Sequence, residues 1–257
     1  MAVVAVLSLK GGVGKTTTVL GLAGAAWARD MRVLVIDVDP QANATASLDV
    51  PPHAFTSGDV LADARPGIAA AAIQPSGWGG RVHVLPSEEA LAHRNRPEGE
   101  RSATRLRAAL AGVADGYDLV LVDCPPSLDE LTRNALAAAD LALVVTEPGF
   151  FALQGADRAL TAIAAARESL NLRLRAAGVL LNRVSPEVPD QRRREAELRQ
   201  AHPGQVLTIT IPERPAVQQA QAAGVPIQAW PSPQAQDVVD AFADLLDTLM
   251  EDAAASG

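Results

Sequence analysis

Residues 3–17 read VVAVLSLKGGVGKTT and determine the expected fold of this chain. The stretch begins with an apolar run, which is typical of a buried strand, and continues into a glycine-rich turn. The turn leads into Lys15–Arg29, where apolar residues recur at helical spacing. A glycine-rich turn between a first strand and a first helix is where parallel α/β proteins bind phosphate. The stretch therefore predicts an α/β protein with a phosphate-binding loop.

The loop itself has the residue types that phosphate binding requires. Glycine lets the backbone bend tightly and bring its N–H groups onto phosphate oxygens. In the expected arrangement Lys15 supplies a positive charge between the terminal phosphates, the Thr16 hydroxyl lies on Mg²⁺, and Thr17 caps the helix near the α-phosphate. The predicted nucleotide-binding residues of the loop are Gly11, Gly12, Val13, Gly14, Lys15, Thr16 and Thr17.

One loop position departs from the standard pattern G-x-x-x-x-G-K-[ST]. The first glycine of that pattern is replaced by Leu9, and a second lysine, Lys10, stands in the loop. The alternative is a strand–helix turn that binds nothing. The position of the loop, the helix after it and the Lys15–Thr16 pair together argue against that alternative.

Three aspartates follow predicted strands and support the assignment. Asp123 ends the run 119–122, where a carboxylate can hold Mg²⁺ through water. Asp37 and Asp39 follow the run 33–36, and their spacing points both side chains to one side if strand geometry persists. These aspartates could instead merely terminate strands and cap helices, but their place beside a phosphate loop favours a functional role.

The order of elements along the chain predicts the architecture. Apolar, β-branched runs predict strands at Val3–Leu7, Val33–Ile36, Val82–Leu85, Leu119–Val122, Ala142–Val145, Ala177–Leu181 and Val206–Ile211. Helical spacing is found in Lys15–Arg29, Ser102–Ala114, Glu130–Ala138, Gln154–Leu170, Gln191–Gln200 and from about Gln234 to Glu251. This alternation predicts one α/β domain, residues 1–252, with a mainly parallel twisted sheet flanked by helices. We expect Pro51–Gly99 to be a surface excursion with short helices and residues 253–257 to be a frayed tail.

Composition restricts the class of protein further. Aromatic residues make up only 3% of the chain, so the core must be built mainly from Ala, Val and Leu. The single cysteine, Cys124, excludes an internal disulfide framework and favours a reducing, cytoplasmic setting. The apolar run at the N-terminus is too short to be a signal peptide or a membrane span, so we expect a soluble protein. A net charge of −8 argues against a generally basic nucleic-acid binder but leaves room for a local basic patch.

These motifs together resemble the deviant-Walker P-loop ATPases of the ParA/MinD superfamily, and the ParA/Soj-type partition ATPases most closely. Lys10 falls at the signature lysine of the superfamily, IDVDPQ (36–41) at its second motif and VLVDCPPS (120–127) at its third. The likeness continues in order through residues 132–136, 147–155 and 178–183, so it covers nearly the whole chain.

The resemblance implies an ATPase with Mg²⁺, and it assigns roles to single residues. Lys10 would reach across a homodimer with sandwiched ATP to the phosphates of the partner subunit. Together with Lys15 it would be catalytic, as would Asp39, which would position the attacking water. Asp37 and Asp123, with Thr16, would serve the Mg²⁺ shell.

The resemblance also implies a base site and partners. Asn182 falls at the adenine-recognising asparagine, and Pro212 lies in the segment that usually flanks the base. The implied function is a dimerising switch that segregates a plasmid or chromosome, binds DNA non-specifically with ATP and is stimulated by a ParB-like or analogous adaptor protein. The expected location is cytoplasmic and nucleoid-associated. Positioning of a protein cargo or organelle on the nucleoid is an alternative.

Other branches of the superfamily fit the residues less well. MinD-like spatial regulators of division bind membranes through a basic amphipathic C-terminal helix, whereas the last predicted helix here carries six acidic residues and no Lys or Arg. We therefore expect no membrane binding, and the apolar positions of this helix to pack on the core. Nitrogenase-iron-protein relatives need two cluster-ligating cysteines per subunit, and Cys124 stands alone. A metabolic P-loop enzyme that phosphorylates or ligates a small substrate remains a rival.

A candidate DNA surface lies in Arg173–Arg199. This stretch contains seven arginines against four acidic residues, and Arg192, Arg193 and Arg194 are its densest group. Contact with DNA phosphates fits such a surplus, since a dimer doubles the patch. A solvated helix face in which the arginines pair with Glu195 and Glu197 fits equally well.

Overall fold

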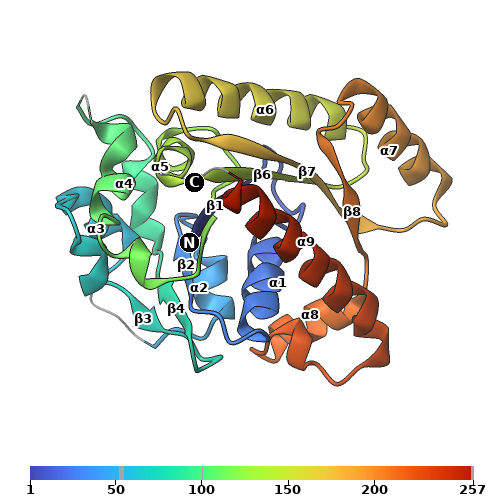
Figure 1. Ribbon diagram of the computed structural model, residues 1–257, viewed down its shortest axis with the longest axis horizontal. Coiled ribbons are helices and arrows are strands. Elements are labelled where there is room, and N and C mark those ends of the chain that lie inside the picture. Colours follow the sequence, from blue (N-terminus) through green and yellow to red (C-terminus); the bar gives the residue numbers. More distant parts are fainter. Residues whose placement is uncertain (52–54, 100, 256–257) are drawn as a thin grey trace.

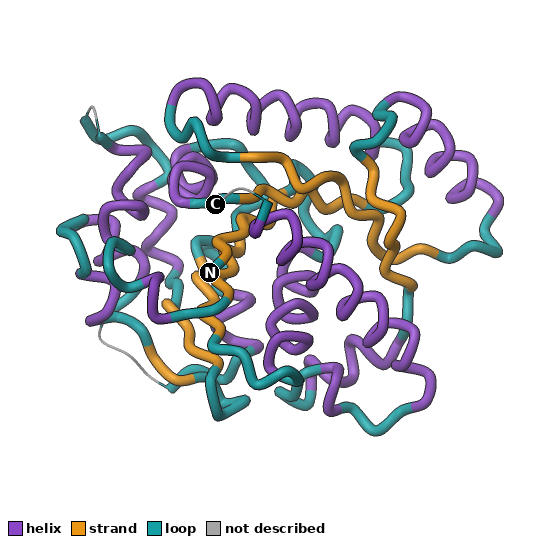
Figure 2. The backbone as a smooth tube through the Cα atoms, in the orientation of Figure 1, coloured by secondary structure: helices purple, strands orange, loops and turns teal. Residues whose placement is uncertain are grey.

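A twisted sheet forms the middle layer of the computed structural model, which describes residues 1–51, 55–99 and 101–255 (Figures 1 and 2). Its strand order is β3-β4-β2-β5-β1-β6-β7-β8. All neighbours pair in parallel except β3 and β4, which are antiparallel. The predicted fold class is thereby confirmed. The strands are β1 (Ala2–Leu7), β2 (Val33–Asp37), β3 (Gln74–Pro75), β4 (Val82–Leu85), β5 (Leu119–Asp123), β6 (Leu141–Thr146), β7 (Arg175–Val184) and β8 (Val206–Pro212).

Helices cover both faces of this sheet. In Figure 1, α5 and α6 lie on one face, and α1 and α9 lie side by side on the other. The α-helices of the described residues are α1 (Lys15–Trp27), α2 (Asn43–Ser47), α3 (Ser57–Asp63), α4 (Arg105–Ala109), α5 (Glu130–Ala138), α6 (Ala152–Ser169), α7 (Pro189–Ala201), α8 (Pro215–Ala222) and α9 (Gln236–Ala254). Crossover helices of this kind bury both faces of a parallel sheet, which explains why the central strands β1, β2, β5 and β6 are buried along their whole length and apolar up to their last residue.

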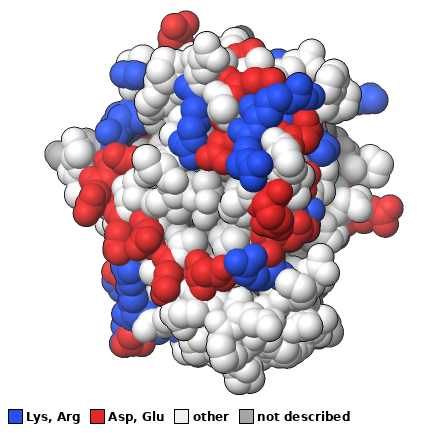
Figure 3. Space-filling model, turned by 90° about the vertical axis from the view of Figure 1, so that its right-hand side faces the viewer, with Lys and Arg blue, Asp and Glu red and all other residues white. Residues whose placement is uncertain are grey.

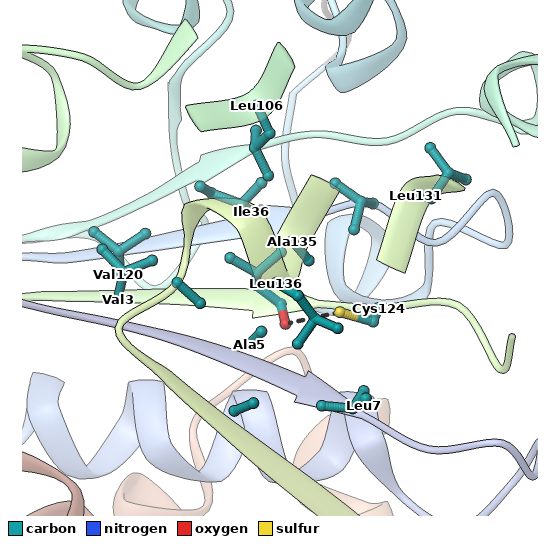
Figure 4. Packing of buried hydrophobic residues seen from close by; sticks show 14 of the residues in the cluster. Val3, Ala5, Leu7, Ile36, Leu106, Val120, Cys124, Leu131, Ala135 and Leu136 are labelled. Carbon is teal, nitrogen blue, oxygen red and sulfur yellow. Dashed lines mark hydrogen bonds between the residues drawn. The ribbon is translucent and has the colours of Figure 1, made fainter. Parts of the chain in front are cut away.

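The core is divided by the sheet into two apolar layers. Successive side chains of a strand point to opposite faces, so Val3, Ala5 and Leu7 of β1 belong to one layer and Val4 and Val6 to the other. Figure 4 shows the first layer, built almost entirely from aliphatic side chains as the composition predicts. Each fully buried Val or Leu side chain contributes about 1.5–3 kcal/mol.

The second layer depends on a close approach between α1 and α9. Phe242 of α9 is fully buried, and its ring lies directly over Gly21 of α1, where a Cβ atom would overlap the ring. Val238, Leu245 and Leu246 on the same face of α9 are also buried. The apolar face of α9 thus packs on the core, as predicted. No helix within the described ranges is long and apolar enough to span a membrane.

Four helical segments differ from the prediction in their extent or were not predicted. The helix predicted over Ser102–Ala114 is wrong, because α4 covers only Arg105–Ala109 between short 3₁₀ turns, and Gly112 adopts a left-handed φ of 74° that stops a longer helix. Helices α2 and α8 were not predicted. α9 extends to Ala254, into the segment predicted to be frayed, while residues 256–257 lie outside the described part of the chain.

The predicted excursion at Pro51–Gly99 contains short elements, including α3 and the antiparallel strand β3, and its residues 52–54 lie outside the described part. The domain limits of 1–252 stay a prediction. The strand order places β5 between β2 and β1, so the carboxyl ends of these three strands meet at one edge of the sheet. The phosphate loop and the predicted aspartates follow these ends.

Candidate functional site

The loop after β1 adopts a conformation that only glycine accepts readily. Gly12 and Gly14 have φ values of 80° and 92°. A Cβ atom on Gly14 would also overlap the amide of Asn182. α1 begins directly afterwards at Lys15, and Thr18 donates both its backbone N–H and its hydroxyl to the Gly14 carbonyl. The loop therefore presents its N–H groups and the positive end of α1 to one space.

That space is a cavity of about 390 Å³ at the carboxyl edge of the sheet. This volume is within the range of small-molecule sites. The loop residues Gly11, Gly12, Gly14, Lys15, Thr16 and Thr17 line one side. Asp39, Gln41, Asn43, Ser47, Pro126, Arg183 and Gln221 complete the lining. Val13, also predicted to bind nucleotide, has its side chain fully buried in the core, so only its backbone is available to a ligand.

Two buried carboxylates lie beneath the cavity. Asp37 and Asp123 are paired across β2 and β5, and both are fully buried. The Thr16 hydroxyl donates to Oδ2 of Asp123 at 2.6 Å, whereas Oδ1 of Asp123 is buried without a hydrogen-bond partner. Burial raises the pKa of Asp123 well above its ordinary value, and the adjacent Asp37 carboxylate raises it further. The pair therefore favours a nearby positive charge.

These features fit Mg²⁺. An unpartnered carboxylate oxygen beside a threonine hydroxyl is an oxygen donor set that this ion prefers. Among the described residues, no three His, Cys, Asp or Glu side chains group closely enough to hold a metal by themselves. The ion therefore needs ligands from elsewhere, which a bound nucleotide's phosphates and water would supply. Thr16 and Asp123 are the residues that would hold it.

Asp37 and Asp39 do not follow the expected strand geometry. β2 ends at Asp37, and the chain turns so that the Asp39 N–H donates to Oδ1 of Asp37 at 3.0 Å. Asp39 lines the cavity, while both oxygens of Asp37 accept hydrogen bonds from protein groups. Burial raises the pKa of Asp37 to about 6, against the opposing effect of hydrogen bonds from Thr45. The two aspartates thus have different surroundings and different possible roles.

Lys10 lies outside the cavity that Lys15 lines. Its side chain is 56% exposed, and its Nζ atom lies 3.4 Å from Oε2 of Glu147. Glu147 also accepts from Arg183 at 2.9 Å, and the same Arg183 nitrogen donates to the Gly12 carbonyl at 2.8 Å. Arg183 has a left-handed φ of 54°, which is uncommon for a side chain of this size. This cluster holds the Lys10 amine at the outer rim of the loop.

The predicted base-binding residues line an adjoining, smaller cavity of about 40 Å³. Asn182 and Pro212 lie there, and Thr17, Arg183 and Gln221 line both cavities. The Asn182 amide donates to the Val13 carbonyl at 2.8 Å, which fixes it against the loop. The two cavities are therefore neighbours, with Pro212 on the side away from the phosphate loop's own cavity.

The predicted DNA-binding arginines are on α7, far from the phosphate loop in sequence and largely engaged locally. Arg193 lies 2.7 Å from Asp190, and Arg194 lies 3.0 Å from Glu197. Arg194 also stacks over Phe150 at 5.1 Å, while Arg192 donates to the Pro186 carbonyl. Figure 3 accordingly shows basic and acidic side chains intermixed over this side of the molecule.

Several residues around the site were not predicted. Glu147 and Arg183 belong to the stretches 147–155 and 178–183, for which the sequence suggested a family likeness but no role at the site. Gln221 is on the unpredicted helix α8, and its amide donates to the Thr17 hydroxyl at 3.3 Å. Thr45 and Ser87, which contact Asp37 and Asp39, were not predicted either. The only available signal was that polar residues follow a strand or flank a loop, a signal that many surface residues share.

Comparison with known proteins gives consistent results. Residues 1–176 match the family model of an AAA domain. The chromosome partitioning protein ParA of Caulobacter vibrioides is 38% identical over 240 residues, which cover 88% of this chain and 86% of that protein. The chromosome-partitioning ATPase Soj of Thermus thermophilus is 36% identical over 208 residues, which cover 81% of this chain and 79% of that protein.

A solved structure extends the likeness to the whole fold. Cobyrinic acid a,c-diamide synthase from Mycobacterium smegmatis, with bound ADP and magnesium, superposes with a TM-score of 0.82 at 27% identity. The superposition covers 98% of this chain and 94% of that one. The strand order and the loop at the carboxyl edge described above are therefore those of a known nucleotide-binding architecture.

Proposed function

Since this chain belongs to the family of ParA-type P-loop ATPases, we propose that it is an ATP-dependent dimerising switch that positions or segregates DNA. One observation carries the proposal. Lys15 lines the cavity, whereas the second lysine of the loop, Lys10, is exposed at its rim. A cation in that position is suited to the phosphates of a second subunit's nucleotide, as a sandwich dimer requires.

The reaction is hydrolysis of ATP to ADP and phosphate. Water attacks the γ-phosphorus and the bond to the bridging oxygen of ADP breaks. The loop N–H groups and Lys15 stabilise the charge that develops on the phosphate oxygens. Asp39, the carboxylate that lines the cavity, is proposed to orient the attacking water. Thr16 and Asp123, with the buried Asp37 beside them, would hold a Mg²⁺ ion that enters with the nucleotide, and this ion would neutralise phosphate charge.

The Mg²⁺ assignment predicts a specific defect for Thr16→Ala. Loss of the hydroxyl removes an oxygen donor and leaves Asp123 Oδ2 without its partner, so the Mg²⁺ concentration for half-maximal hydrolysis should rise about tenfold or more. Titration of hydrolysis with Mg²⁺ at saturating ATP measures this. The matched control is Thr18→Ala, whose hydroxyl bonds the Gly14 carbonyl. Equal Mg²⁺ midpoints for Thr16→Ala and the control would contradict the assignment.

The proposed DNA surface is α7, with Arg192 and Arg193 as its exposed cations. Both are exposed at the surface, whereas only 20% of the Arg194 side chain is accessible. The ion pair of Arg193 with Asp190 is exposed and contributes little, and Arg192 donates to the Pro186 carbonyl, so phosphate oxygens can replace these partners. A dimer would present two such surfaces, which strengthens a contact that is weak in one subunit.

Salt-dependent retention on DNA tests this surface. The double substitution Arg192→Ala with Arg193→Ala should lower affinity in the presence of ATP about tenfold or more and flatten its salt dependence, because phosphate contacts release counterions. The control is Arg65→Ala with Arg81→Ala, which removes the same charge from exposed ion pairs elsewhere. If both double variants lose affinity equally, α7 is not the DNA surface.

The remaining partners are proposed from the family alone. Dimerisation with sandwiched ATP, nucleoid association and an adaptor protein that stimulates hydrolysis form one cycle, in which ATP favours DNA binding and hydrolysis ends it. Positioning of a protein cargo on the nucleoid would use the same cycle. A MinD-like role at a membrane is disfavoured, because α9 buries its apolar face and carries acidic residues outside.

A second candidate is an enzyme that acts on a small molecule, as the name of the Mycobacterium smegmatis synthase states for that protein. The two functions differ in what accelerates ATP hydrolysis. Hydrolysis that proceeds without a small substrate and rises when DNA is added supports the switch. Hydrolysis that requires a small carboxylic acid with an amine donor, and ignores DNA, supports the second candidate.

A further inference from the structure

We propose that Thr45 and Ser87 form a hydrogen-bonded relay that positions Asp37 and Asp39 for ATP hydrolysis. The inference rests on the proposed function, because it assigns positioning residues to that reaction. It also gives a role to the excursion at Pro51–Gly99, which contains Ser87 and whose described residues do not line the main cavity.

The relay consists of four buried hydrogen bonds. Thr45 donates its backbone N–H and its hydroxyl to Oδ2 of Asp37, at 2.9 and 2.8 Å. The Ser87 N–H donates to the same Thr45 hydroxyl at 2.9 Å. The Ser87 hydroxyl donates to the backbone carbonyl of Asp39 at 2.7 Å. The four residues are at most 8% exposed.

The hydroxyl of Thr45 cannot be replaced by an apolar group of the same shape. It donates one hydrogen bond and accepts another, so its removal leaves two buried groups, Asp37 Oδ2 and the Ser87 N–H, each with one partner fewer. Threonine and serine carry a donor and acceptors on one atom, whereas valine has neither. The relay therefore depends on the hydroxyl rather than on side-chain volume.

The relay holds Asp39 through residues that do not themselves line the cavity. The backbone of Asp39 is held on both sides, its N–H by Asp37 and its carbonyl by Ser87. Oδ1 of Asp39 accepts from the Gln41 N–H at 3.0 Å, which orients the carboxylate itself. Since the carboxylate lines the cavity, a shift of this backbone moves the group that orients water. A displacement of about 1 Å in such a group can cost on the order of 100-fold in rate.

The excursion fixes Ser87 in turn. The Pro86 carbonyl accepts from the Ser57 N–H at 2.7 Å, and Glu88 accepts from the Thr56 hydroxyl at 2.6 Å. Both donors belong to the beginning of α3, whose helix cap is Thr56. Ser87 is thereby held between α3 on one side and the aspartate turn on the other.

Single-turnover hydrolysis by the full chain, with the ATP dissociation constant measured separately, tests the relay. Thr45→Val should lower the hydrolysis rate constant about tenfold or more and change ATP affinity less than about threefold, because Thr45 does not line the cavity. Thr45→Ser, which keeps the hydroxyl, should return the rate constant to within about twofold of the unsubstituted chain. Ser87→Ala should lower it about fivefold, because the Asp39 carbonyl then loses the Ser87 hydroxyl and keeps only the Ala42 N–H as a donor, at 2.9 Å.

Combining the substitutions separates a relay from two independent effects. Because both residues act on one turn, the double variant should be no more than about twofold slower than Thr45→Val alone. A rate constant for Thr45→Val within about twofold of the original, while the original hydrolyses ATP, overturns the relay and leaves the proposed function standing. Equal losses for Thr45→Val and Thr45→Ser also overturn it. An original chain that does not hydrolyse ATP overturns both. If Thr45→Val shows no thermal unfolding transition, it is not folded, and Ser87→Ala takes its place in the test. With ATP affinity unchanged, a loss of about fivefold in its rate constant supports the relay, and a rate constant equal to that of the original overturns it.

Discussion

Replacing Lys15 with alanine is expected to abolish detectable ATP binding and to lower hydrolysis by at least about 100-fold. Lys15 is 7% exposed, lines the phosphate cavity and lies at the start of α1. Without it, phosphate would enter a site whose nearest ionisable groups include three carboxylates, those of Asp37, Asp39 and Asp123. Titration with a fluorescent ATP analogue and a phosphate-release assay measure the two effects.

The Lys15→Ala substitution is also expected to change the stability of the folded chain. A buried cation near buried carboxylates offsets part of their repulsion, so its removal should lower the unfolding temperature as well. Lys15→Arg keeps the charge but changes its shape, and it should fold normally while binding ATP poorly, because arginine is a wide planar group and lysine is a compact charge. Normal ATP binding and hydrolysis by Lys15→Ala would refute the phosphate-loop assignment.

Replacing Lys10 with alanine is expected to lower hydrolysis about 30-fold or more while leaving ATP binding to one subunit within about threefold. The Lys10 amine lies at the rim, in an exposed ion pair with Glu147 that contributes about 0–1 kcal/mol. Little free energy therefore opposes its transfer to the nucleotide of a second subunit. Glu147 keeps Arg183 as a partner when Lys10 leaves, so no carboxylate is left unpaired.

Parallel measurements of ATP affinity and hydrolysis on Lys10→Ala and Lys15→Ala distinguish the roles of the two lysines. They are the only lysines in the chain, so each substitution can be read without interference from a third. Arg65→Ala, which removes one exposed positive charge elsewhere, serves as the control for net charge. Lys10→Ala should still bind ATP, whereas Lys15→Ala should not. If both lose binding to the same extent, Lys10 acts within its own subunit.

Much of the fold could be predicted because its signals are local and repeated. Apolar β-branched runs and helical spacing mark the parallel strands and long helices, and glycine with Lys15 marks the loop. The helix predicted over Ser102–Ala114 failed because a single residue, Gly112, takes a left-handed conformation that the apolar spacing around it does not reveal. α8 was missed because it has only eight residues and buries only Ala216 and Ala220, so its apolar spacing is weak.

The phosphate loop and the aspartates of the candidate site could be predicted from the sequence, but the residues that position these aspartates could not. Aspartates at strand ends are visible in the sequence, but the hydrogen bonds from Thr45 and Ser87 to the turn at Asp37 and Asp39 are not. Ser87 is 42 residues from Thr45, and no local pattern joins them. The arginines of α7 illustrate the converse, since the sequence left open whether they pair internally, and the structure shows ion pairs with Asp190 and Glu197.

The molar mass in solution with Mg²⁺ and a non-hydrolysable ATP analogue tests the two-subunit switch most directly. Light scattering during size exclusion should give twice the 26.7 kDa of one chain for the original protein with the analogue, and one chain without it. Lys10→Ala should bind the analogue and remain at one chain. A single-chain mass for the original protein at saturating analogue, or a dimer of Lys10→Ala as stable as that of the original, would contradict the account.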